Sequence, residues 1–441
     1  MINQPTGAEA FPYPEITNDI LDDITPKSEA IYVPSVSVGY AKGALMFNQL
    51  RQQGLPMPNL PANVLNFLDP TNPNFRLSHA MASYGQFRGK HGDTIFSPSK
   101  RDMARTCVIG DSGGYQWATN KINFSNQGEQ LRALRWLEAN CNIAMCLDAP
   151  TSRLGDKDCP FTDFRDCLDR TCQTLRLFEN KRQNGGVKFL NVIHGSTAIE
   201  AERWYRTVRH YRFEGFAFGG PLRFDAYHLL RMLILMHQEG DLAKVQWCHV
   251  LGTAQLSTAV LLTAIQRAVK QHLGHNIRFS FDTSTPFRML VANEAFGYPL
   301  LSEHELKVTQ WPAPAGQFYR GKRLMWPWAS KLGDIIELND VYVQCGAGNT
   351  TQRDTLGNFL LALHNLQALC FAVRNVNRVF DVQLVVGAKS GITQVGDAEM
   401  KAIEGIDAVL RKPDLRNLQA HLPMFAAHHQ KIRAVNHSIM E

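Results

Sequence analysis

Short apolar runs alternate with longer amphipathic segments along most of the chain. The short runs have the length and composition of buried strands, and apolar residues recur at helical spacing in the segments between them. The runs expected to form strands are residues 31–33, 107–110, 143–147, 189–193, 216–219, 248–251 and 277–281. The segments expected to form helices are residues 128–140, 163–183, 199–212, 225–238 and 254–272. This alternation indicates a parallel sheet covered by helices.

Residues capable of chemistry recur at the carboxyl ends of these strands. They are Asp111, Asp148, His194, Gly219, Gly220, Gly252 and Asp282. An open doubly wound sheet and a closed barrel both fit the alternation of strands and helices. An open sheet, however, concentrates its site at one switch point, whereas a barrel collects side chains from many successive strand ends. We therefore expect an α/β protein built on a (β/α)8 TIM-type barrel.

The two ends of the chain depart from the alternating pattern. About the first 100 residues are rich in Pro and Asn, and we expect them to form loops around one early strand. After an irregular stretch, residues 358–373 predict an amphipathic helix, residues 379–386 predict a strand, and the segment from Ala398 predicts a basic helical tail. We expect residues 1–441 to form a single barrel domain, with residues 305–360 as an inserted subdomain.

The composition is that of an ordinary globular protein, with 44% hydrophobic and 20% charged residues. No apolar run approaches the roughly 18–20 residues that a membrane helix needs. No basic-then-apolar signal sequence follows Met1. We expect a cytoplasmic protein without a membrane partner. The net charge of +6 fits a polyanionic partner but does not identify one.

Three aspartates follow apolar strand-like runs: Asp111, Asp148 and Asp282. A carboxylate in that place can act as a nucleophile, as a general acid or base, or as an acceptor for a nucleic-acid base. One such aspartate alone is more often a helix cap or a turn former. Three at successive strand ends indicate a site. Gly219-Gly220 permits close backbone approach to a flat ligand but also suits a tight turn.

The segment Asp111-Ser112-Gly113-Gly114-Tyr115-Gln116 resembles the signature of the tRNA-guanine transglycosylase superfamily, whose members carry Asp-Ser-Gly-Gly-Phe/Tyr-Gln. Further segments resemble the family's motifs in the same order. They are Leu147-Asp148, the run Gly215-Phe216-Ala217-Phe218-Gly219-Gly220, His249-Val250-Leu251-Gly252, residues 281–288 and the late helix at residues 361–366. The resemblance covers roughly residues 107–373. The first motif is specific, and the others carry weight as a series.

This resemblance implies a barrel enzyme that exchanges guanine in nucleic acid for a 7-deazaguanine. Asp282 would attack C1′ of the nucleoside and form a covalent intermediate, and Asp111 would act as acid and base. Asp148 would accept hydrogen bonds from N1–H and the amino group of the base. The resemblance also assigns to base recognition Ser112, Tyr115, His194, Gly219, Gly220, Leu251 and Gly252. Of these, Tyr115 and Leu251 would enclose the ring, and the glycine pair would donate to O6.

The zinc-ligand region departs from the family pattern. The late helix retains His364, but of the family's Cys-x-Cys-x-x-Cys, which precedes that helix, only Cys345 remains. Because structural zinc requires four ligands, we expect no zinc, no other cofactor, and a degenerate C-terminal subdomain. That subdomain helps to hold tRNA in the tRNA-modifying members of the family.

The expected base pocket also departs from the family. His194 stands where tRNA-modifying members carry a glutamine, Pro221 replaces a leucine near the 7-substituent, and Asp225 stands near a family glutamate. Such divergence resembles the DNA-modifying branch, found in phages and bacterial modification islands, which inserts preQ0-type bases into DNA. We therefore expect DNA and free preQ0 or a relative as substrates, in a bacterial cell or a phage-infected host. The alternatives are a divergent enzyme acting on tRNA and a non-catalytic partner subunit, although both Asp111 and Asp282 survive.

Basic residues predict the contact with the nucleic-acid backbone. Arg288 lies six residues after Asp282, and Arg320, Lys322 and Arg323 stand among aromatic residues that could stack on an unpaired base. The second group is equally compatible with a surface loop anchored by its tryptophans. A homodimer or helper proteins that open the duplex are further expected partners.

Overall fold

The structure is a computed structural model of the chain. It describes residues 28–47, 60–183, 186–220, 225–253, 255–292, 294–301, 305–313, 323–341, 355–386 and 396–428. Its centre is an eight-stranded parallel sheet in the order β1-β8-β7-β6-β5-β4-β3-β2. The strands are β1 (Ile31–Pro34), β2 (His79–Ser83), β3 (Cys107–Asp111), β4 (Ile143–Met145), β5 (Lys188–Ile193), β6 (Gly215–Phe218), β7 (Trp247–Val250) and β8 (Arg278–Thr283).

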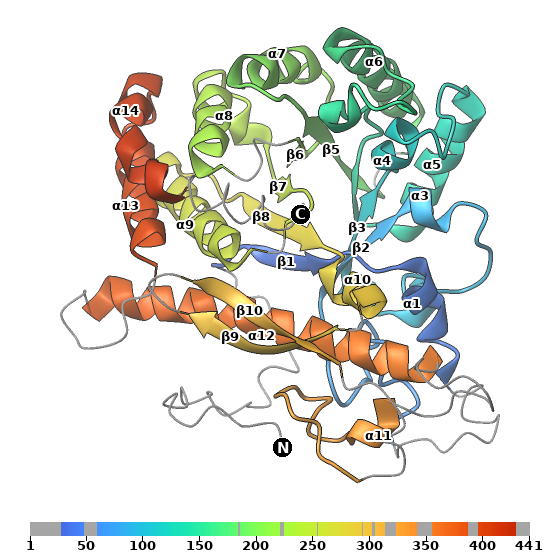
Figure 1. The fold of residues 1–441 in the computed structure, drawn as a ribbon. Helices are drawn as coiled ribbons and strands as arrows, with labels where there is room; N and C mark the ends of the chain where they lie inside the picture. The colour runs from blue at the N-terminus through green and yellow to red at the C-terminus, as the bar shows by residue number, and fades with distance from the viewer. Residues whose placement is uncertain are drawn as a thin grey trace.

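The sheet curves until its two edge strands meet. A parallel bridge joins Ser35, just after β1, to Met81 of β2, and the amide of Val36 donates to the Met81 carbonyl at 3.0 Å. Helices follow the strands and surround them (Figure 1). The molecule is therefore a nearly closed (β/α)8 barrel of the TIM type, as the polar residues at successive strand ends predicted.

The helices around the barrel vary in length. They are α1 (Val38–Gly43), α3 (Tyr84–Phe87), α4 (Gly114–Ala118), α5 (Gln127–Asn140), α6 (Phe164–Lys181), α7 (Ala198–Val208), α8 (Ala226–Gln238), α9 (Leu256–Leu273) and α10 (Thr285–Ala292). The rest of the described chain forms an antiparallel hairpin, β9 (Glu294–Leu301) and β10 (Leu306–Pro312), with α11 (Leu338–Val341), α12 (Thr355–Val386), α13 (Asp397–Arg411) and α14 (Leu415–Ala420). In Figure 1 the hairpin and α12 lie together below the barrel.

The strands are apolar on both faces because each face is buried. Alternate residues such as Leu190 and Val192 fill the barrel interior, whereas Phe189 packs outward with the helices. The interior layer consists of Ile31, Val33, Met81, Ile109, Ile143, Met145, Leu190, Val192 and Ala217. This double burial is the reason that the strands read as continuous apolar runs in the sequence.

Two elements differ from the sequence-based expectation. Residues 379–386, expected as a strand, are the last turns of α12. No Gly or Pro interrupts residues 358–386, and Val373, Val376 and Phe380 lie on one buried helical face. The second difference is β2, which falls in the stretch expected to contain only one early strand. Its sequence, His-Ala-Met-Ala-Ser, is poor in the β-branched residues that favour strands.

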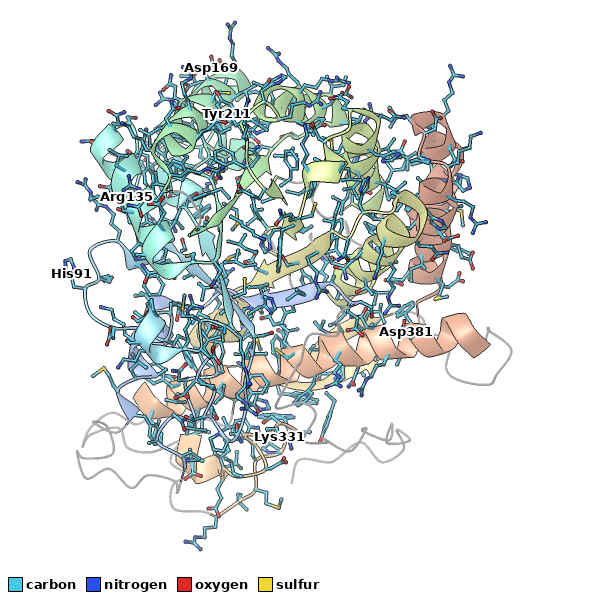
Figure 2. All side chains as sticks on the ribbon, turned by 180° about the vertical axis from the view of Figure 1, so that it is seen from behind. His91, Arg135, Asp169, Tyr211, Lys331 and Asp381 are labelled. Carbon is cyan, nitrogen blue, oxygen red and sulfur yellow. The ribbon has the colours of Figure 1, made fainter. Side chains whose placement is uncertain are left out.

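Helix α12 is a core element. Among the described residues it alone is long and apolar enough to cross a membrane, over Leu356–Asp381, but 83% of its apolar window is buried inside the protein. An ion pair between Arg267 of α9 and Asp381, labelled in Figure 2, fastens its far end to the barrel. Such burial is typical of the central helix of a soluble protein. The hairpin that packs on α12 begins at Glu294, ahead of the expected subdomain boundary at residue 305.

Candidate active site

The carboxyl ends of six neighbouring strands converge at one end of the barrel, because parallel strands all end on the same side. In the order β3 to β8 they supply Asp111, Asp148, His194, the pair Gly219 and Gly220, the pair Leu251 and Gly252, and Asp282. The sequence-predicted site residues on the strands are thus brought to one face.

Asp282 of β8 is 6% exposed, and one of its carboxylate oxygens is held in place. Its Oδ1 accepts a hydrogen bond from the amide of Gly252 at 2.7 Å and lies 3.2 Å from Nε2 of His249. Gly252 has a φ of +65°, a left-handed conformation that favours glycine and that aims its amide at the carboxylate. Among the described residues Oδ2 has no hydrogen-bond partner. One oxygen is therefore fixed, and the other remains available to a ligand.

Asp111, the last residue of β3, has a carboxyl group whose pKa lies above its ordinary value. The Ser83 hydroxyl donates to Oδ2 at 2.6 Å, and the Gly113 amide lies 3.3 Å from Oδ1. Burial raises the pKa of Asp111 to about 6, and repulsion from Asp148 and Asp282 adds to this, against the lowering effect of the Ser83 hydrogen bond. A carboxyl group with such a pKa suits general acid and base catalysis.

Asp148 is paired with His194. Oδ2 of Asp148 lies 2.7 Å from Nε2 of His194, and the two residues are 7% and 3% exposed. The imidazole ring packs edge-on against Trp204, with centroids 5.1 Å apart, and the indole is itself fixed by a hydrogen bond to the Val192 carbonyl. Among the described residues the Asp148 side chain caps no helix, so the helix-cap alternative does not hold for it.

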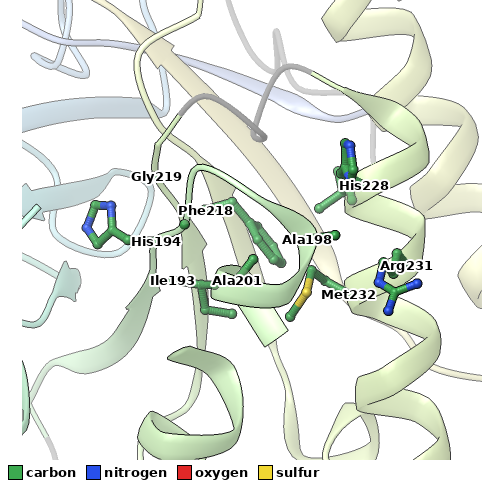
Figure 3. Close-up of a pocket in the computed structure, with 11 residues that line it drawn as sticks. Ile193, His194, Ala198, Ala201, Phe218, Gly219, His228, Arg231 and Met232 are labelled. Atoms are coloured by element: carbon green, nitrogen blue, oxygen red, sulfur yellow. The ribbon is translucent and has the colours of Figure 1, made fainter. Parts of the chain in front are cut away.

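Gly219 leaves room for a neighbouring side chain, and its amide is not available to a ligand. Its amide, expected to donate to a bound base, donates instead to the Ile193 carbonyl at 2.9 Å as part of the strand ladder. A Cβ atom at Gly219 would lie 2.5 Å from Cε1 and 2.8 Å from Nδ1 of His194, so the imidazole edge fills the room that the missing side chain leaves. Figure 3 shows Gly219 close to the His194 side chain, at a mainly apolar pocket lined by residues of α7 and α8.

The remaining predicted base contacts differ in accessibility. Tyr115 is 53% exposed, and the guanidinium carbon of Arg153 lies 5.9 Å from its ring centroid. Leu251 is partly exposed and packs against the interior layer of the barrel. Ser112 is fully buried and donates its hydroxyl to the Cys146 carbonyl at 3.2 Å. Ser112 therefore ties the loop after β3 to the end of β4, and the two partly exposed side chains are open to a ligand.

The predicted backbone contacts are only partly described. Arg288 is exposed on α10, the helix that follows the Asp282 strand, and among the described residues it makes no ion pair. Arg323 is also exposed. Arg320 and Lys322 lie outside the described residues, as do Pro221 and Cys345. Asp225 caps α8 by accepting a hydrogen bond from the Tyr227 amide at 2.8 Å.

Sequence reasoning missed two residues that touch the carboxylates. Ser83 lies opposite Asp111 in the register of β2 and β3, but β2 was not expected. His249 is fully buried in β7 and contacts Asp282. Its place two residues before Leu251 was a usable signal, because alternate residues of a strand share one face.

His364 does not have the surroundings of a zinc ligand. Its Nδ1 accepts from the Trp326 indole at 3.1 Å and lies 2.8 Å from the Ser330 hydroxyl, and its Nε2 lies 2.7 Å from the Phe296 carbonyl. Burial lowers the pKa of His364 to about 4. Both ring nitrogens are thus engaged within the protein, which does not fit a metal site.

Purified protein is accordingly expected to contain no stoichiometric zinc, because the described partners of His364 leave no nitrogen lone pair for a metal. Elemental analysis after gel filtration checks this expectation. One zinc per chain, retained through dialysis against a weak chelator, would contradict it.

Compared with known proteins, the chain matches no family model and no curated protein.

Proposed function

We propose that this protein is a guanine transglycosylase of the tRNA-guanine transglycosylase superfamily, which exchanges guanine in nucleic acid for a 7-deazaguanine. The observation that carries the proposal is the different surroundings of three neighbouring carboxylates. Oδ1 of Asp282 accepts two contacts and Oδ2 has no partner among the described residues. Burial raises the pKa of Asp111 to about 6, and Asp148 is paired with His194. Nucleophile, acid/base and base acceptor are the three roles that such an exchange requires.

The exchange consists of two displacements at C1′. In the first, Oδ2 of Asp282 forms a bond to C1′ as the C1′–N9 bond breaks, the electron pair leaves with guanine, and the Asp111 proton passes to the departing base. In the second, N9 of the incoming base attacks C1′, its proton goes to Asp111, and the C1′–Oδ2 electron pair returns to Asp282. Every proton and electron pair is balanced, so the reaction needs no cofactor.

Base recognition rests on Asp148 and His194. The carboxylate would accept hydrogen bonds from N1–H and the amino group of the base, while the exposed ring of Tyr115 and the Leu251 side chain would lie on its two faces. Nδ1 of His194 is buried and unpaired among the described residues. A buried polar atom without a partner at a candidate site is expected to find one in a ligand.

Replacement of Gly219 by alanine is expected to weaken binding of free guanine or preQ0 about ten- to hundredfold, because the new methyl group displaces His194 from Asp148. Calorimetric titration measures this affinity. Gly39→Ala is the matched control, since no heavy atom lies within 4 Å of the Cβ position there. Equal affinities for the two variants would show that the Asp148–His194 pair takes no part in base binding.

We further propose that the polymer is DNA and that the incoming base is preQ0 or a close relative. Two observations support this proposal. Both ring nitrogens of His364 are engaged within the protein, which does not fit the zinc subdomain that helps tRNA-modifying members of the family to hold tRNA. The second is that position 194 holds a histidine where those members carry a glutamine. The target nucleotide must be single-stranded or flipped out of its stack, since attack on C1′ needs an exposed sugar face. Divergent action on tRNA is the second candidate.

The test is mass spectrometry of nucleosides after incubation of the protein with preQ0 and, separately, single-stranded DNA, duplex DNA and tRNA. The expected product is the preQ0 deoxynucleoside, formed faster in single-stranded than in duplex DNA because unstacking costs a few kcal/mol. Product in tRNA alone would reverse the choice of polymer. Absence of product with all three polymers, for a folded protein, would contradict the transglycosylase proposal.

A further inference from the structure

A chain of hydrogen-bonded side chains runs between β7 and β8 and ends on Asp282. The Trp247 indole donates to the Ser280 hydroxyl at 2.7 Å, and this hydroxyl lies 2.7 Å from Nδ1 of His249. Nε2 of His249 in turn lies 3.2 Å from Oδ1 of Asp282. His249 and Ser280 are direct partners in the parallel register, and both are fully buried.

These hydrogen-bonded side chains lie against an apolar interior. Trp247 and Leu251, which alternate with His249 along the strand, pack against the aliphatic layer of the barrel. Burying a hydroxyl and an imidazole there is costly unless each is hydrogen-bonded, and apolar side chains would pack the same space without that cost. Packing alone therefore does not explain this series of hydrogen-bonded side chains, and the one carboxylate in the series is Asp282.

The chemistry of the four groups fixes the direction of the hydrogen bonds. The Trp247 indole can only donate, and an ionised Asp282 can only accept. Nε2 of His249 must therefore carry a proton, because an unprotonated nitrogen would place two lone pairs against each other. When the ring holds a single proton, the Ser280 hydroxyl donates to Nδ1. Every donor in the chain then faces an acceptor.

We infer that His249 is a positioning residue for Asp282, which with the Gly252 amide holds Oδ1 so that Oδ2 is the oxygen that attacks C1′. This inference rests on the proposed function. Two donors on one oxygen prevent rotation of the carboxylate and present the second oxygen in a single orientation, and such pre-orientation lowers the barrier to attack. Ser280 and Trp247 act on Asp282 through the orientation of the imidazole.

The same donors govern the fate of the covalent intermediate. Attack by Oδ2 turns the carboxylate into an ester, whose carbonyl oxygen Oδ1 is a weaker acceptor than the charged group. In the second displacement the C1′–Oδ2 electron pair returns to Asp282, and the negative charge that re-forms is stabilised by His249 and Gly252. Loss of the His249 donor therefore slows departure of Asp282 from C1′ and causes the covalent form to accumulate.

A first experiment tests the hydrogen bond without requiring activity. Protein labelled with 15N in its histidines is compared with a His249→Leu variant, which assigns the His249 signals by their loss. A protonated Nε2, whose shift changes in an Asp282→Ala variant, is the expected result. An unprotonated Nε2 at His249 would overturn the inference.

A second experiment measures turnover and the fraction of enzyme trapped as covalent adduct on denaturing gels. For His249→Leu we expect turnover to fall about ten- to hundredfold, a higher adduct fraction, and little change in KM for the free base. His249→Gln, which offers an amide donor near the place of Nε2, should recover most of the turnover. Ser280→Ala should lower turnover when it is introduced into the wild-type protein, but it should not lower turnover further in the His249→Leu variant.

His272→Leu is the matched control, because it breaks a similar contact, His272 Nε2 to Asp407 Oδ1 at 2.6 Å, between α9 and α13. It should leave the adduct fraction unchanged. If the wild type is active and His249→Leu has the same turnover and adduct fraction, the role of His249 is overturned and the proposed function is not. A wild type that forms neither product nor adduct would overturn the proposed function and this role with it.

Discussion

Asp282→Ala is expected to abolish base exchange, with turnover reduced at least about 10⁴-fold and no covalent adduct detectable. The variant removes the carboxylate that forms the bond to C1′ in the proposed mechanism, and Asp111 acts there as acid and base and not as nucleophile. Mass spectrometry of nucleosides measures the residual exchange, and adduct formation is followed on denaturing gels.

The control for Asp282→Ala is Asp414→Ala. Asp414 also precedes a helix, but its carboxylate caps α14. Its loss should lower the free energy of unfolding by about 1 kcal/mol and leave exchange intact. If Asp282→Ala kept more than a few per cent of wild-type exchange, or if the two variants lost activity equally, Asp282 would not be the nucleophile.

Asp111→Asn is expected to reduce turnover about 10²- to 10⁴-fold and to remove a characteristic pH dependence. Asp111 must be protonated to neutralise departing guanine, so kcat/KM for the nucleic acid should fall as pH rises through about 6, where its pKa lies. It must be ionised to accept the proton of the incoming base, so kcat/KM for the free base should rise with pH. That rise should lie at a lower pH, because the esterified Asp282 no longer raises the pKa of Asp111 by repulsion. The two opposite profiles are measured by varying one substrate at a time.

Ser83 provides a control for the assignment of this pH dependence. Its hydrogen bond lowers the pKa of Asp111, so Ser83→Ala should move both profiles to higher pH without removing them. If the dependence of kcat/KM on pH were the same in the wild type, in Ser83→Ala and in Asp111→Asn, the titrating group would be one other than Asp111.

The same pKa makes a prediction about stability. Because the folded protein holds the Asp111 proton more tightly than the unfolded chain, this group favours folding at low pH. That contribution is lost as pH rises from the ordinary value of 3.8 to about 6. Asp111→Asn should lack this loss, so its stability relative to wild type should increase over that window. Urea denaturation at a series of pH values tests the sign.

The parts of the fold that the sequence predicted are those in which one physical signal dominates. Strands β3, β5 and β8 are buried on both faces, so their apolar runs end within one or two residues of the observed limits. The last turns of α12, residues 379–386, were misjudged because a valine-rich run is compatible with either strand or helix when tertiary packing decides. β2 was missed because its alanines carry little preference for a strand.

The site was predictable in position but not in connectivity. Asp111, Asp148 and Asp282 follow from strand ends alone. That Asp148 pairs with His194, and that Gly219 makes room for this pair instead of donating, depends on distances across neighbouring strands. No single-sequence pattern contains such distances. The same holds for His249, whose partner lies 33 residues away.

The pairing of β1 with β8 places Val33 opposite Asp282, and this has a consequence for how the molecule is made. β1 is the first described strand of the sheet, and its partner β8 is made about 250 residues later, which at roughly 5–20 residues per second takes on the order of 10–50 s. During that time the edge of β1 that pairs with β8 has no partner strand. β8, which bears the proposed nucleophile Asp282, is the last strand of the described sheet to be synthesised. Under the proposed function, a chain interrupted before β8 lacks Asp282 and is expected to carry out no exchange.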